Sequence, residues 1–172
     1  MQNKLWVIKA FILTFFICML ISGLSNVVAN NANLILLFLI TIIIILIGIV
    51  FDIIGTAVLT ANESSFHAKA SNKIRGSKES LKLIKNSSNI ANFCNDIIGD
   101  ICGIVSGSMG AMIAIHLADK MELSPTITAL IVSSIISSIM VGGKAIGKNI
   151  AVKKSDSIIF MVGKILNKQK KG

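Results

Sequence analysis

The chain has few charged and few aromatic side chains for its length. Of its 172 residues, 15% are charged and 5% are aromatic, whereas 53% are apolar. Soluble domains carry about 25% charged residues, so this composition argues against folding in water. Basic and aromatic residues do not interleave, which argues against nucleic-acid binding despite a net charge of +9. The composition predicts a membrane protein whose basic groups meet anionic lipid headgroups.

Motifs that carry reaction chemistry are also scarce. Cys18, Cys94 and Cys102 form no Cys-x-x-Cys pair and lie in or beside apolar runs, so we interpret them as small buried residues. His67 and His116 each stand alone, without partners at the spacing of a metal site. No nucleophile lies in a recognisable pattern with a base. The sequence therefore predicts a protein that is not an enzyme.

Long apolar runs are what the sequence does contain. Most reach the roughly 20 residues that a helix needs to cross a hydrocarbon core of about 30 Å. A single strand in lipid would leave its backbone groups unpaired, so the runs are predicted to be helices. The expected fold is an all-α, polytopic membrane protein of about four transmembrane helices. The runs are Leu5–Ala29, Asn33–Ala61, Ile97–Ala118 and Thr126–Gly143.

The runs divide the chain into three parts. Residues 1–30 are predicted to be an N-terminal transmembrane anchor. The alternative is a signal peptide cleaved after a small-residue site that ends at Ala29. Residues 33–166 form the main transmembrane domain, and residues 167–172 form a basic tail.

The positions of Lys and Arg predict the orientation. All of them except Lys120 fall before or near the start of the first run, between the second and third, or after the fourth. By the positive-inside rule, both termini and the central loop lie in the cytoplasm, and the protein is a multi-pass protein of the cell membrane. Apolar residues at helical spacing among these lysines predict amphipathic helices at the membrane surface, around Leu81 and around Ile159.

Four ionisable residues fall inside or at the ends of the runs, where charge is costly and therefore a functional hypothesis. They are Asp52, Asp96, Asp100 and Lys144. Asp96 and Asp100 lie one helical turn apart, and their oxygens suit a hard cation such as Mg²⁺. The alternative for Asp96 is that it caps the start of the third helix.

Small residues recur every four positions on the third run. Such a stripe lets a neighbouring helix approach closely, because packing drives helix association in lipid. We expect the stripe to place Asp100 inside a helix bundle. The stripe consists of Gly99, Gly103, Gly107 and Ala111.

In the order TANESSFHAKASNKIRG, FCNDIIGDICG and GGKAIGKNIA, three segments resemble the transmembrane domain of the CNNM/CorB/CorC family of magnesium and cobalt transporters. TANESSFHAKASNKIRG resembles the SGSE-type end of the family's first helix. FCNDIIGDICG resembles the IGN-type start of its next helix, and GGKAIGKNIA stands where its GEILPK motif closes the last one. The resemblance implies a three-helix core preceded here by one extra helix, a homodimer, and a cytoplasm-facing cavity for Mg²⁺ or Co²⁺ without an organic cofactor.

The resemblance also implies metal ligands at particular positions. The family's hydroxyl positions fall on Thr60 and Asn62, its acidic residue falls on Glu63, and its helix-start Asn falls on Asn95. These residues keep oxygen atoms, as magnesium requires.

The Glu of GEILPK falls on Lys144, which departs from the family pattern. An ammonium group donates hydrogen bonds and repels a divalent cation. Lys144 either extends to the headgroups or pairs with Asp100 or Asp52. Two functions therefore compete. The first is cation transport along Asp52, Asn62, Asn95 and Asp100, and the second is a transport-incompetent membrane protein retained for assembly or for regulation of a partner.

Overall fold

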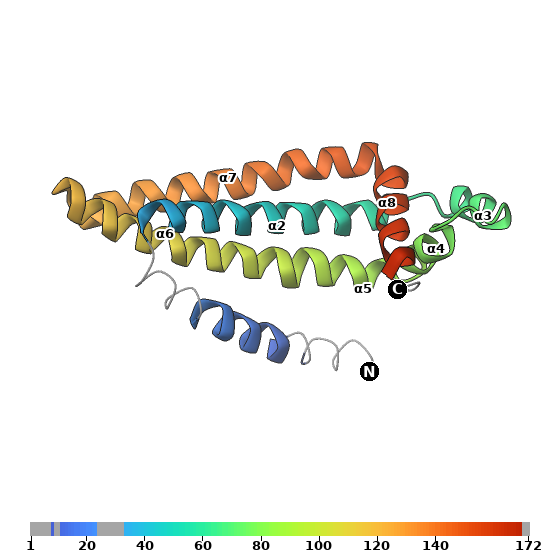
Figure 1. Cartoon of the computed structure of the whole chain (residues 1–172), viewed down its shortest axis with the longest axis horizontal. Coiled ribbons are helices and arrows are strands. Elements are labelled where there is room, and N and C mark those ends of the chain that lie inside the picture. Colours follow the sequence, from blue (N-terminus) through green and yellow to red (C-terminus); the bar gives the residue numbers. More distant parts are fainter. Residues whose placement is uncertain (1–7, 9–10, 24–32, 170–172) are drawn as a thin grey trace. The chain divides into compact units, whose positions relative to one another are not determined.

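The computed structural model describes residue 8 and residues 11–23 and 33–169, and every regular element in these ranges is a helix (Figure 1). This confirms the all-α class. A short apolar helix, Phe11–Gly23, comes first. The elements that follow are α2 (Leu34–Thr60), α3 (Glu63–Ser71), α4 (Ser77–Lys85), α5 (Ser87–Ala91), η1 (Asn92–Ile98), α6 (Gly99–Met121), α7 (Pro125–Lys153) and α8 (Ser155–Gln169).

Three helices in the described ranges are long and apolar enough to cross a membrane: Leu34–Thr60, Ser87–Met121 and Pro125–Lys153. The second of these joins α5, η1 and α6. The N-terminal helix Phe11–Gly23 is apolar but shorter. The predicted anchor of residues 1–30 and the tail of residues 167–172 lie partly outside the described residues. The coarse prediction of a multi-pass membrane protein is thus supported by three helices.

The third predicted run begins earlier than the sequence indicated. Helical structure starts at Ser87 rather than Ile97, because Ala91 is buried and Ile90 packs against the same apolar cluster. The predicted run left this polar stretch outside the span, and packing of Ile90 and Ala91 makes it continuous with the long helix. Asp96 therefore lies within helical structure and does not cap a helix start. It lies in η1, a π-helix, which is a rare conformation that often occurs at functional sites.

The chain forms two compact units, and the first contains residues 1–48 and 97–142. In it, α2 buries one narrow seam, Leu37, Thr41, Ile45 and Gly48, while most of its other side chains are exposed. Leu37 packs against α6. A helix that is apolar on every side but buries one seam is suited to face lipid elsewhere.

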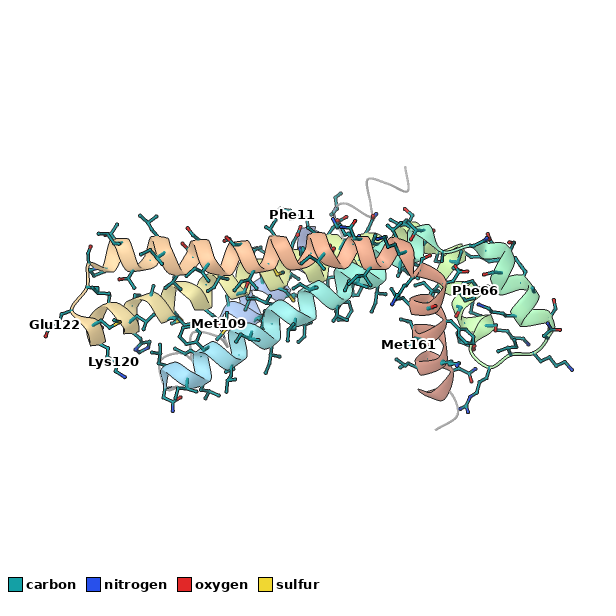
Figure 2. The ribbon with its side chains drawn as sticks, turned by 90° about the horizontal axis from the view of Figure 1, so that it is seen from above. Phe11, Phe66, Met109, Lys120, Glu122 and Met161 are labelled. Atoms are coloured by element: carbon teal, nitrogen blue, oxygen red, sulfur yellow. The ribbon has the colours of Figure 1, made fainter. Side chains whose placement is uncertain are left out.

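Close helix contacts in the first unit occur at glycines outside the predicted stripe. A Cβ atom on Gly110 of α6 would collide with Ile136 of α7, and one on Gly48 would lie 2.7 Å from the Cε of Met140. Met109, labelled in Figure 2, is fully buried beside this contact. Small residues at these places let the helices approach closely.

The second unit contains residues 49–96 and 143–172. Here α8 runs crosswise to the end of α7 and lies against α4 (Figure 1). The Ser80 hydroxyl donates to the Ile159 carbonyl at 3.0 Å, which ties α4 to α8. Phe66 of α3 is fully buried and lies toward α8, whereas Met161 on the opposite side of α8 is exposed (Figure 2). The core of this unit thus joins the loop after α2 to the helix after α7.

Candidate cation site

Asp52 of α2 is the deepest of the predicted ligands. Its side chain is 2% exposed, and it makes at least one polar or electrostatic interaction within the protein. A buried carboxylate needs such partners, because losing water costs several kcal/mol per ion. Asp52 is therefore a buried acidic residue with an interaction inside the protein, in a helix that is mainly apolar.

Asn95 of η1 lies beside the same part of α2. A Cβ atom on Gly55 would collide with the Asn95 side-chain oxygen, so the glycine is what allows the amide to approach α2. This Oδ1 atom is buried and accepts no hydrogen bond from any described residue. A buried acceptor without a donor costs about 1–3 kcal/mol and calls for an explanation, such as an ion.

Helix geometry brings Asp52 and Asn95 to one region. Asp52 and Gly55 are three residues apart on α2, so their side-chain positions share one face. The amide of Asn95 lies on Gly55. One carboxylate and one amide carbonyl, from two helices of the same unit, provide the oxygen atoms that a hard cation prefers.

Three of the predicted ligands make local helix contacts in the structure: Thr60, Asn62 and Glu63. The Thr60 hydroxyl donates to the Thr56 carbonyl at 3.1 Å. Eight residues of α-helix separate Thr60 from Asp52, which corresponds to about 12 Å along the axis. That distance far exceeds the roughly 2.1 Å of a magnesium–oxygen bond, so Asp52 and the hydroxyl of Thr60 do not share an inner coordination sphere.

Asn62 and Glu63 build the start of α3. The Asn62 Oδ1 accepts from the backbone N–H of Ser64 at 3.0 Å, as an N-cap residue does. The Glu63 carboxylate lies 3.2 Å from the His67 ring one turn later. Asn62 and Glu63 are both exposed.

Asp156 is a residue that the sequence interpretation missed. Its two oxygens accept from the Asn62 backbone N–H and from the Ser65 hydroxyl, each at 2.8 Å. It stands in the first turn of α8, where a carboxylate is favoured by the helix dipole. The Ser155–Asp156 pair at the end of α7 was the available signal for this start of a helix. Asp156 links α8 to the start of α3.

The remaining predicted residues differ in their surroundings. Asp100 belongs to the first unit and is exposed, contrary to the expectation that it lies inside a bundle. Lys144 belongs to the second unit and is half-buried. Each makes at least one polar or electrostatic interaction.

The small-residue stripe also has mixed surroundings. Gly99 is buried, whereas a Cβ on Gly103 would meet only Met140 at 4.0 Å and one on Gly107 would meet nothing within 4 Å. Ala111 is exposed. The outward part of the stripe leaves room for lipid or another chain, and its role in helix association stays a prediction.

Within the described residues, no three His, Cys, Asp or Glu side chains lie close enough together to hold a metal ion. The candidate cation site is therefore the Asp52–Asn95 pair, which contains only one acidic group. Comparison of the chain with protein-family models, with curated proteins and with solved structures found no significant match.

Proposed function

We propose that this protein is a multi-pass membrane protein that moves a divalent cation, Mg²⁺ or Co²⁺, past Asp52 and Asn95. The observation that carries the proposal is the buried Asn95 oxygen, which has no hydrogen-bond donor among the described residues and lies beside the turn that holds Asp52. Mg²⁺ is commonly bound through one or two carboxylates while it keeps several waters. The resemblance of three segments to the CNNM/CorB/CorC transmembrane domain supports the same substrate.

The proposed membrane arrangement has four spans. Helix Phe11–Gly23 would form part of the first span, and both termini would be cytoplasmic, as the distribution of Lys and Arg favours. Helices α4 and α8 would lie at the membrane surface among anionic headgroups. The exposed outward part of the small-residue stripe, at Gly107 and Ala111, fits a homodimer contact.

Transport is tested by uptake of Mg²⁺ and of Co²⁺ into liposomes that contain the purified protein and a fluorescent metal indicator. We expect uptake by the native protein and its loss in Asn95→Leu, which removes the amide oxygen while keeping the branched shape of the side chain. Asn89→Leu is the matched control, because Asn89 is an exposed residue of the same helical stretch. Equal uptake by native protein and Asn95→Leu would contradict the proposed pathway.

A second function is favoured by the residue at position 144. Lys144 is half-buried and interacts within the protein, at the position where the family has a metal-binding Glu. A fixed positive charge near a cation site opposes metal binding. On this alternative, the fold is retained for assembly with a partner or for its regulation. Absence of uptake by well-folded native protein would support this alternative over transport.

A further inference from the structure

The turn between α3 and α4 forms a pocket of about 390 Å³ in the second unit. Three cationic residues line it: Lys73, Arg75 and Lys78. Glu79 and Asn167 also line it, and Asn167 comes from α8. The pocket therefore joins the loop after α2 to the helix after α7.

The three cations have no ion-pair partner among the described residues, a set that includes every Asp and Glu of the chain. Glu79 shares the pocket without lying within 4.0 Å of any of the three charged groups. The formal charge of the lining is thus three positive and one negative. A concave site lined by charge of mainly one sign concentrates ions of the opposite sign.

The Arg75 side chain is held in place from α8. Its Nε–H donates to the Asn167 Oδ1 at 3.2 Å. A guanidinium has five N–H groups, so four donate to no described residue, and their planar fork matches the oxygens of a phosphate. Gly76 provides no side-chain cap for α4, so the first backbone N–H groups of this nine-residue helix add positive potential.

We propose that this pocket binds a phosphate monoester, carried by the headgroup of a membrane lipid. A phosphate monoester bears about −1.5 to −2 charges at neutral pH, which matches the excess positive charge of the lining. Ile74, which itself lines the pocket, is 43% exposed. An exposed apolar side chain in the lining of a cationic pocket suits a ligand with both acyl chains and a charged headgroup. The site requires no metal, so it is independent of the cation transport proposed above.

The test measures thermal unfolding of the full-length protein in detergent against increasing short-chain phosphatidic acid. EDTA is present, so metal binding does not contribute. We expect saturable stabilisation of the native protein. In Lys73→Gln and in Arg75→Gln, half-saturation should require about tenfold more lipid, because each variant removes a charge-assisted contact. Lys85→Gln is the matched control, since it removes the same charge from the exposed far end of α4 and should behave as the native protein does.

Two further ligands test whether the bound phosphate belongs to a lipid and whether it is a monoester. Inorganic phosphate that stabilises the protein as strongly as the lipid would assign the pocket to a free phosphate compound and overturn the lipid assignment. Phosphatidylglycerol, a diester with a single charge, should bind about tenfold more weakly than phosphatidic acid because it matches the lining charge less well. Equal binding of the two lipids would overturn the preference for a monoester.

Glu79→Gln should change the affinity for phosphatidic acid in the opposite direction. Removing the one negative group of the lining should tighten phosphatidic acid binding by several-fold. A site with only a structural role would not gain affinity from this change. Unchanged stabilisation in Lys73→Gln, Arg75→Gln and Glu79→Gln alike would show that the lipid binds elsewhere.

Discussion

Gly55 and Asn95 form the closest contact of the candidate cation site. A Cβ at position 55 would occupy the place of the Asn95 side-chain oxygen, so Gly55→Ala must displace the amide. We expect a loss of about 1–3 kcal/mol in unfolding free energy, as for overpacked positions, together with reduced cation uptake. Gly142→Ala is the control, since its Cβ would meet nothing within 4 Å. Denaturant unfolding in detergent measures the stability of both variants. Equal stability of Gly55→Ala and Gly142→Ala would contradict this contact.

Substitution of Lys144 distinguishes cation transport from the transport-incompetent alternative. If its charge keeps the cation site silent, Lys144→Glu should gain metal-dependent thermal stabilisation, of about 2.7 kcal/mol at Mg²⁺ concentrations a hundred times the dissociation constant. Lys148→Glu, one turn later and exposed, makes the same charge change and should gain nothing. Metal stabilisation of the native protein that is equal in Lys144→Glu would eliminate the silent-site explanation.

At the scale of whole elements, helices α4 and α8 pack closely against each other at Gly163. A Cβ on Gly163 would lie 2.6 Å from the Gly76 carbonyl oxygen and 3.0 Å from the Ser80 backbone nitrogen. Backbone atoms of a neighbouring helix cannot move aside as a side-chain end does. Gly163→Ala should therefore separate α8 from α4 and lower stability by about 1–3 kcal/mol, despite the better helix propensity of alanine.

The control for this substitution is Gly107→Ala on α6. Its Cβ would lie in open space, so we expect unchanged or slightly higher stability. Thermal unfolding followed by circular dichroism compares the two proteins. A Gly163→Ala variant as stable as Gly107→Ala would show that α8 does not need this close approach.

At the scale of the whole molecule, the basic residues predict which loops face the cytoplasm. In a variant whose native cysteines are replaced by alanine, Lys120→Cys should react with a membrane-impermeant maleimide from outside intact cells. Lys85→Cys, which is also exposed on the structure, should react only after the membrane is opened. Protection of position 120 from the external reagent would reverse the assigned orientation.

The location of the N-terminus tests the number of spans. If the helix that contains Phe11–Gly23 crosses the membrane, a tag at residue 1 lies on the same side as a tag at residue 172. If the helix does not cross, three spans place the two tags on opposite sides. Protease protection of each tag in sealed vesicles measures this directly, and opposite sides would overturn the four-span prediction.

The sequence by itself determined the class of the protein and the identity of most long helices. Stretches such as Leu34–Thr60 are apolar on every side, and lipid offers their backbone groups no partner outside a helix. The loop after α2 was also predicted to contain a helix from the spacing of Leu81 and Ile84, and α4 lies there with Ile84 buried. These features depend on local composition and periodicity, which a sequence contains in full.

Only the tertiary structure decided which faces meet. The first half of α2 is apolar on almost every side and carries little periodic signal, so the seam of Leu37, Thr41 and Ile45 could not be predicted. For the same reason the contacts of Gly110 and Gly55 were missed, although the glycines themselves are visible in the sequence. Asp52 and Asn95, 43 positions apart in the chain, come to one place because helices from both segments pack in one unit, and packing of that kind depends on shape rather than on spacing.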